Sequence, residues 1–413
     1  MRCIVDGDVV LSRPLEGPLS ARIPAFSAWA REQGYVLLSR RRKVHLAACF
    51  CRWLGQQRAL SVRRLCAKDA TRYLRSRARR VQICFGDPPA LRQFLEFLRR
   101  EGSIPPEKVV PRRLTPVERH MRDFETYLRN ERVLAEATVV NYVPFVRRFL
   151  TDRFGTGRAT LSRLCARDVV RFVQRQAPRL HQGCGKLLTT ALRSFLHYAR
   201  YRGHISCDLA AAVPCVPNWS MAPIPRAIPP EAVRQLLASI DRRTPVGRRD
   251  YAILLLLARL GLRASEVVSL ELDDIDWAAG QLNVRGKGGQ RAALPLSPEV
   301  GRAIAEYLQD GRPLSASRRA FLQAKAPIQG LQGQGIIKSI VQRALERAGI
   351  KSPTKGAHQF RHALATQMLR GGASLTEIGE VLRHRSPETT TIYAKVDLDA
   401  LRPLALPWPG GAR

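Results

Sequence analysis

The sequence is poor in acidic residues, has no long apolar run and has no paired cysteine motif. Its 413 residues include 34 Asp plus Glu against 69 Lys plus Arg, which gives a formal net charge of +35 at pH 7. Because a globular chain with such an excess repels itself, we expect a polyanionic partner, with nucleic acid ahead of an anionic membrane surface. The apolar stretch YAILLLLA is far shorter than the ~20 residues that cross a bilayer, so the sequence predicts no membrane partner.

Cysteine is present without a pattern. The nine cysteines form no CxxC pair, and none follows residue 215. A zinc site or a disulfide framework is therefore not expected; we predict reduced, mostly buried thiols, with Cys49 and Cys51 in the core, and no metal or other cofactor. The opening residues, MRCIVDGDVVLSRP, lack the layout of a signal peptide, so the sequence predicts a soluble cytoplasmic protein.

Two proline-rich joints divide the chain, SIPPEKVVPRRLTP (103–116) and VPCVPNWSMAPIPRAIPP (213–230). Proline stops helices and stiffens extended connections, so both joints indicate linkers. We predict an N-terminal helical domain over residues 1–108, a second helical domain with its linker over 109–222, and a third domain over 223–413.

The first two predicted domains resemble each other. RRLCAKDATRYL (63–74) parallels SRLCARDVVRFV (162–173) at an offset of 99, and LRQFLEFLRREGSI (91–104) parallels LRSFLHYARYRGHI (192–205) at an offset of 101. Two ordered blocks with consistent offsets indicate an internal duplication of a domain of about a hundred residues. Apolar residues recur at helical spacing and leave arginines outside the buried stripe, which favours a helical DNA-binding surface over an ordinary solvated face.

The third domain mixes helices with extended segments. Helical stretches such as RDYAILLLLARL flank IDWAAGQLNVRGKGGQRAALPL, whose short extended runs and glycine-rich turns predict a small antiparallel sheet. The predicted fold class is therefore mainly α and multidomain, with two helical DNA-binding domains followed by an α+β domain that contains a small antiparallel sheet.

Five basic residues near predicted turns of the third domain share an affinity for phosphate oxygens: Arg263, Lys287, His358, Arg361 and His384. Arginine forks match the two non-bridging oxygens of a phosphodiester and stabilise the extra charge of a pentacoordinate transition state. Tyr393 follows in HRSPETTTIYAKVD and is a candidate nucleophile. The aspartates of LDDIDW have no second carboxylate motif to complete a metal site, so we expect phosphoryl transfer in which cationic side chains replace a metal ion.

Four blocks of the third domain, ARLGLRASEVVSLELDDIDW, RGKGGQRAALPL, HQFRHALATQML and VLRHRSPETTTIYAKV, resemble the signature blocks of the tyrosine recombinase (phage integrase) family, in the family's order and spacing. The resemblance is close over residues 225–400. It is looser over 115–210, which is similar to the family's core-binding domain, and it reaches the N-terminal copy only through the duplication. It implies site-specific cleavage and rejoining of duplex DNA through a 3′-phosphotyrosyl intermediate, without metal or ATP.

The same resemblance implies a role for each matching residue. Tyr393 would attack the scissile phosphate, Arg263 and Arg361 would bind its non-bridging oxygens, and Lys287 would protonate the leaving 5′ oxygen.

Further positions of these blocks complete the predicted site. His358 would help to accept the tyrosine proton, His384 would hydrogen-bond the phosphate, and Glu266 would support Arg263. The sequence departs from the family at Arg383, since Leu-Arg-His stands where Leu-Gly-His is common. We expect His362 to point elsewhere on its helix and to be structural, and the prolines of the tail LRPLALPWPGGAR disfavour a long docking helix.

The predicted assembly is a homo-tetramer on two DNA sites, with accessory recombinases or DNA-bending proteins as further candidates. The extra N-terminal domain favours an integrase or transposase of a mobile element, associated with the nucleoid of a bacterium. Two other classes stay open: a catalytically silent DNA-binding regulator with the same fold, and an RNA-binding protein. The sequence shows no aromatic RNP-like strand, which disfavours RNA.

Overall fold

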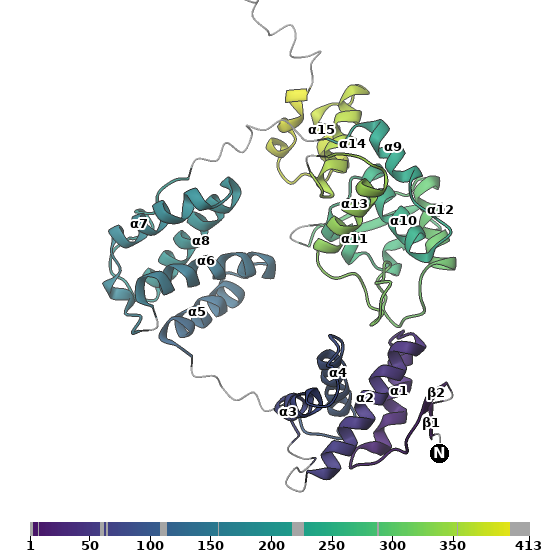
Figure 1. The fold of residues 1–413 in the computed structure, drawn as a ribbon. Coiled ribbons are helices and arrows are strands. Elements are labelled where there is room, and N and C mark those ends of the chain that lie inside the picture. Colours follow the sequence, from purple (N-terminus) through teal and green to yellow (C-terminus); the bar gives the residue numbers. More distant parts are fainter. Residues whose placement is uncertain are drawn as a thin grey trace, which may run out of the picture. The chain divides into compact units, whose positions relative to one another are not determined.

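The computed structural model describes most of the chain (Figure 1): residues 3–6, 8–57, 62, 65–107, 114–155, 157–216, 227–286, 289–352 and 354–396. Residues 108–223 form one compact unit, and residues 1–107 together with 224–413 form another. The finer division into three domains, at 108 and 222, stays a prediction.

The first segment combines helices with a short antiparallel hairpin. Its elements are β1 (Cys3–Asp6), β2 (Val9–Leu11), η1 (Ser20–Arg22), α1 (Ile23–Glu32), α2 (Leu37–Gln56), α3 (Ala67–Ala78) and α4 (Asp87–Arg100). The helices confirm the predicted helical character, whereas the hairpin was not predicted. Aromatic side chains fill the core between the helices, and fully buried Phe26 meets Phe94 edge to face with ring centroids 4.9 Å apart.

The second segment is helical throughout its regular elements. These are α5 (Pro116–Thr126), the π-helical turn η3 (Tyr127–Glu131), α6 (Glu136–Phe154), η4 (Leu161–Arg163), α7 (Ala166–Gln176), η5 (Ala177–Arg179) and α8 (Gln182–Tyr201). Figure 1 shows these helices packed together, and α6 contacts α5, α7 and α8. Phe124 and Phe195 meet edge to face in their shared core, with ring centroids 5.3 Å apart.

The two predicted copies have helices that start in the same way. α3 begins after Cys66, whose backbone N–H donates to the Asp69 carboxylate at 3.0 Å, and α7 begins after Cys165, whose N–H donates to Asp168 at 3.2 Å. Each thiol also donates to the same carboxylate. These reciprocal contacts satisfy backbone donors that a helix start leaves unpaired. The two segments therefore share the same hydrogen bonds at a helix start as well as a sequence pattern.

The prediction of mostly buried thiols is wrong. Among the cysteines whose burial the structure describes, Cys51 is buried and Cys49 is half-buried against the same core. Five others are exposed, namely Cys84, Cys165, Cys184, Cys207 and Cys215. For Cys165 the physical reason is local, because it sits at the start of α7, where its side chain caps backbone groups instead of filling a core.

The third segment surrounds an apolar helix. Its helical elements are α9 (Pro230–Ala238), α10 (Pro245–Arg259), α11 (Ala264–Ser269), η6 (Leu272–Asp274), α12 (Pro298–Asp310), α13 (Gly335–Arg347), α14 (His358–Arg370), α15 (Leu375–Val381), η7 (Pro387–Thr389) and η8 (Thr391–Val396). α10 packs against α9, α11, α12 and α14, and every residue from Ala252 to Leu257 is fully buried. A helix that is apolar on all sides belongs inside a core, which explains the run YAILLLLA. Among the helices that the structure describes, none is long and apolar enough to cross a membrane.

The predicted small sheet is confirmed as three antiparallel strands. They are β3 (Ile275–Asp276), β4 (Gln281–Arg285) and β5 (Arg291–Pro295), in the order β3-β4-β5. Leu282 and Val284 of β4 point into the core while their neighbours are exposed, as the two-residue period of a strand requires. α11 packs against β4, so the sheet borders the helix that follows Arg263.

Candidate active site

Arg361 joins two turns that are far apart in the sequence. It lies in the first turns of α14 and is only 4% exposed. Its guanidinium donates to the carbonyl oxygen of Gly261 at 2.7 Å and to that of Leu382. The turn before α11 and the end of α15 are therefore held against the same side chain. Gly261 has φ of +56°, and a Cβ there would come within 2.9 Å of the Leu382 side chain, so glycine is required at this close approach.

Glu266 is the carboxylate of the site. It is 2% exposed and accepts from the backbone N–H of Arg263 at 2.9 Å and from the Arg263 guanidinium at 2.8 Å, which confirms the predicted contact. It also accepts from the Arg383 guanidinium at 2.9 Å. Burial works to raise the pKa of Glu266, but the Arg263 backbone and the Arg383 charge outweigh it and lower the pKa. The carboxylate is therefore ionised and fixes two arginines.

The chain accommodates Arg383, at a position where the family often has glycine, through both its backbone and its side chain. Its backbone adopts φ of +55°, a left-handed conformation that costs a non-glycine residue about 1 kcal/mol or more. Its side chain turns inward to Glu266, and its own backbone carbonyl faces the Arg263 guanidinium at 3.4 Å. Arg383 Nε is buried and has no hydrogen-bond partner within the described part of the chain. The departure from the family thus adds a third guanidinium to the site.

The site carries an excess of positive charge. Arg263 and Arg383 share Glu266, and Arg361 forms no ion pair with a carboxylate among the residues that the structure describes. Burial, followed by the charges of Arg263 and Arg383, lowers the pKa of Arg361 to about 10. An anion placed between these side chains would relieve their repulsion, and phosphate oxygens match the fork of a guanidinium.

Tyr393 is held next to this charge. It lies in η8, is 2% exposed, and its backbone N–H donates to the carbonyl of Thr390 at 3.0 Å. The Thr390 hydroxyl lies 2.7 Å from Nδ1 of His384, whose ring is parallel to the tyrosine ring with centroids 6.4 Å apart. Burial raises the pKa of the Tyr393 hydroxyl, while the Arg361 charge works to lower it. The structure thus brings together Arg361, His384 and Tyr393, as the sequence predicted.

The expectation that His362 points away from the predicted site is wrong. Its Nδ1 lies 3.1 Å from the Tyr393 hydroxyl oxygen, and the two rings meet edge to face with centroids 5.7 Å apart. The available signal was its spacing of four from His358, because residues at i and i+4 share one face of a helix. The contact itself could not be read from the sequence, since it joins α14 to η8.

Two predicted residues differ from the others in position. His358, at the first position of α14, is exposed, with its ring centroid 6.5 Å from that of His362. Lys287 lies outside the described residues, as does the C-terminal tail from residue 397. Within the described ranges, no group of three or more His, Cys, Asp or Glu side chains is arranged to hold a metal ion.

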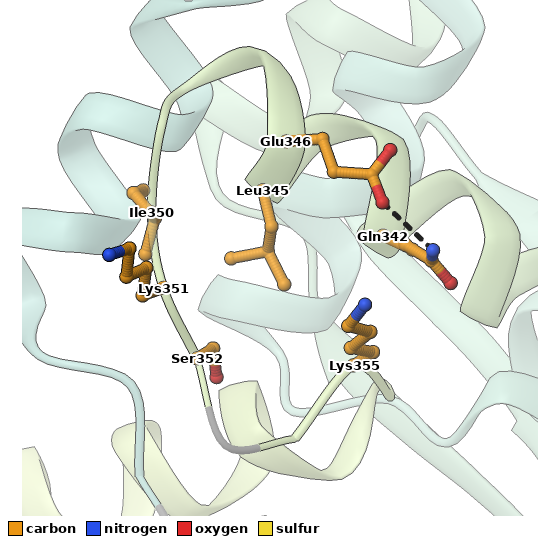
Figure 2. A pocket seen from close by; sticks show the side chains of 7 residues that line it. All are labelled: Gln342, Leu345, Glu346, Ile350, Lys351, Ser352 and Lys355. Atoms are coloured by element: carbon orange, nitrogen blue, oxygen red, sulfur yellow. Dashed lines mark hydrogen bonds between the residues drawn. The ribbon is translucent and has the colours of Figure 1, made fainter.

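A hollow of about 490 Å³ opens at the C-terminal end of α13 (Figure 2). Its lining residues are Gln342, Leu345, Glu346, Ile350, Lys351, Ser352 and Lys355. Gln342 donates to Glu346 at 2.8 Å, and Ser352 donates to Gln359 of α14 at 2.9 Å. None of the predicted site residues lines this hollow, so the arginine and tyrosine cluster is a separate feature of the domain.

Acid is expected to destabilise the third segment through its half-buried histidines. Burial, helped by the charges of Arg361 and Arg263, lowers the pKa of His384 to about 4, and burial also lowers the pKa of His362. Histidine in an unfolded chain titrates near pH 6.5. As the pH falls below this value, the unfolded chain therefore binds protons at these histidines before the folded chain does. Stability should be complete above about pH 6.5 and should fall towards pH 4, by on the order of 2 kcal/mol from His384 alone.

Urea unfolding of the full chain between pH 4 and pH 7 measures this effect. His384→Asn is the matched variant, because an amide keeps a polar atom near Thr390 and does not titrate. The difference between the two pH curves isolates His384 from the carboxylates that also titrate near pH 4. Parallel curves for wild type and variant would show that His384 is not the source.

Comparison with known proteins agrees with this architecture. The profile described as the Phage integrase family matches residues 226–399. The integrase/recombinase y4rA of Sinorhizobium fredii is 55% identical over the full length of both chains. The tyrosine recombinase XerD of Listeria monocytogenes is 31% identical over 67% of this chain and 93% of its own.

Solved structures share the fold. XerH recombinase bound to its palindromic difH substrate has a TM-score of 0.57 at 20% identity, covering 70% of this chain and 84% of its own. A lambda integrase dimer bound to a COC′ core site has a TM-score of 0.51 at 17% identity, covering 67% and 94%. By these similarities the chain is a site-specific tyrosine recombinase. The chain belongs to the phage integrase family.

Proposed function

We propose that this recombinase cleaves and rejoins duplex DNA through a covalent bond between Tyr393 and the 3′ phosphate of the cut strand, without metal or ATP. One observation carries the proposal: two guanidinium groups share a single buried carboxylate, and a third, that of Arg361, has only carbonyl partners among the described residues and lies close to a buried tyrosine. That excess of charge suits the phosphorane-like transition state of an in-line attack, where the extra negative charge is spread over the non-bridging oxygens.

The predicted residues that the structure describes take parts consistent with their surroundings. Arg263 and Arg361 bind the non-bridging oxygens, since both are anchored and both retain guanidinium donors. His384 engages Thr390 through Nδ1, which leaves Nε2 for a phosphate oxygen. Lys287 is proposed to protonate the leaving 5′ oxygen, and His358 contributes from the exposed start of α14.

The biological setting is proposed to be integration, excision or transposition of a mobile element. The full-length similarity to y4rA, which is named as an integrase/recombinase, supports this setting. The proposed partner is duplex DNA, bound by a homo-tetramer that assembles on two sites, with accessory recombinases or DNA-bending proteins as further candidates. The duplicated N-terminal segment would lengthen the contact with DNA, and the chain would act in the bacterial cytoplasm at the nucleoid.

Covalent trapping tests the chemistry. The full chain is incubated, in EDTA, with nicked duplexes made from the DNA that flanks its gene, because loss of the short fragment past the nick prevents rejoining. We expect a denaturation-resistant adduct whose proteolytic fragment carries the nucleotide on Tyr393, one of nine tyrosines in the chain. An adduct on another residue would refute the proposed nucleophile. DNA binding without an adduct on any flank would favour the silent regulator.

A further inference from the structure

His362 is the side chain in direct contact with the reacting oxygen. The Nδ1–Oη distance of 3.1 Å is that of a hydrogen bond, and the phenol is 2% exposed. His384 and His358 are placed differently, since His384 Nδ1 is engaged by Thr390 and His358 is exposed. Within the described residues, no hydrogen bond joins either of them to Tyr393.

The Tyr393 hydroxyl must lose its proton when its oxygen attacks phosphorus, so a proton acceptor is needed next to it. A phenol buried in protein holds its proton more tightly than one in water, and burial raises the pKa of Tyr393 accordingly. A neutral imidazole can accept that proton if its Nε2 carries the ring hydrogen. Burial, followed by the charges of His358 and Arg361, lowers the pKa of His362, so that the ring is neutral and free to accept at pH 7.

We propose that His362 takes the hydroxyl proton of Tyr393 during attack and returns it during rejoining; this rests on the proposed role of Tyr393 as nucleophile. In cleavage, the Oη–P bond forms, the P–O5′ bond breaks, and the Oη proton passes to Nδ1 of His362. The 5′ oxygen takes its proton from a separate acid, proposed to be Lys287. In rejoining, the 5′ oxygen attacks phosphorus, the tyrosine leaves, and the imidazolium gives the proton back.

The family resemblance assigns this proton to His358, so the geometry points to a different histidine one turn later on α14. His362 lies with Arg361 and His358 on α14, and it faces Tyr393 on η8 and His384 before η7. Arg361 is positively charged, and His358 and His384 become so when protonated. Positive charge next to His362 favours its neutral form. The phosphate of a bound DNA strand would offset that field as the imidazolium forms.

The test compares His362→Asn with His358→Asn on two DNA substrates. Asn keeps a polar atom near the position of Nδ1 and cannot take the proton. One substrate has the normal 5′ oxygen at the cleaved bond, and the other has sulfur there, a leaving group that needs no protonation. We expect His362→Asn to slow adduct formation by about 10²-fold or more on both substrates. A residue that protonates the leaving group would lose its effect on the sulfur substrate.

The pH profile separates proton transfer from mere positioning. With the sulfur substrate, the wild-type rate should fall at low pH as His362 becomes protonated, and His362→Asn should lack this limb. His362→Gln is measured alongside, with the thermal midpoint of each variant, so that a folding defect in one does not determine the result. Three results would overturn this inference alone. They are a wild-type rate in both His362 variants, recovery of the His362→Asn rate on the sulfur substrate, and loss of the low-pH fall in rate in His358→Asn instead of His362→Asn. No Tyr393 adduct in wild type would overturn the proposed function with it.

Discussion

Replacing Tyr393 by phenylalanine is expected to eliminate the covalent adduct, with a loss of at least about 10⁴-fold, while the chain stays folded and binds DNA. Phenylalanine fills the same buried space in η8, so the core loses no apolar contact. The change removes the hydroxyl that His362 contacts at 3.1 Å, which should cost about 1 kcal/mol of stability. Adduct formation on the nicked duplex and the thermal midpoint measure the two effects.

Tyr307→Phe is the matched control. Tyr307 lies in α12, is 1% exposed, and its hydroxyl accepts from the backbone N–H of Leu322 at 3.1 Å. Its loss should destabilise the same segment by a similar amount and leave adduct formation unchanged. An adduct that persists in Tyr393→Phe, or that disappears equally in Tyr307→Phe, would be incompatible with Tyr393 as the nucleophile.

Arg361→Lys is expected to reduce adduct formation by about 10²-fold or more, although it keeps the positive charge. One ammonium group cannot reproduce the fork that reaches both Gly261 and Leu382, so one of these carbonyls is left without its donor. Because such an orphaned buried group costs about 1–3 kcal/mol, the variant should also unfold at lower urea concentration. The rate is measured well below the unfolding midpoint, where all of the protein is folded.

Arg249→Lys serves as the comparison for stability alone. Arg249 is also buried, and its guanidinium bonds to Asp250 at 2.7 Å and to the carbonyl of Leu322 at 3.0 Å, away from Tyr393. Both variants should lose stability, and only Arg361→Lys should lose cleavage when folded protein is compared. Equal rates in the two variants would show that Arg361 acts through folding and does not bind the phosphate.

Much of the fold follows from local patterns. The helices of the first two segments match the predicted apolar spacing, and Gly102 and Gly203, just past α4 and α8, have φ of +64° and +70°, as helix ends favour. The extended runs around the glycine-rich turn became β4 and β5. The hairpin of β1 and β2 was missed, because two short strands carry little periodicity.

The same distinction between local patterns and long-range contacts applies to the candidate site. Residue types and spacing pointed to Arg263, Arg361, His384 and Tyr393, since a short sequence block carries each one with its neighbours, and their catalytic roles stay a prediction. Pairing between blocks was not predictable. His362 and Tyr393 are 31 residues apart, Gly261 and Arg361 are 100 apart, and Glu266 and Arg383 are 117 apart.

The family and the helical character were thus readable from the sequence, because each depends on residues close together along the chain, whereas the duplication and the reactive roles of the site residues stay predictions. Which histidine meets the tyrosine hydroxyl depended on the packing of α14, α15 and η8 against one another, and how Arg383 fits in place of a glycine depended on its contact with Glu266. The physical reason is that a side chain's partner is set by three-dimensional distance and burial, and helical spacing determines only the face on which that side chain lies.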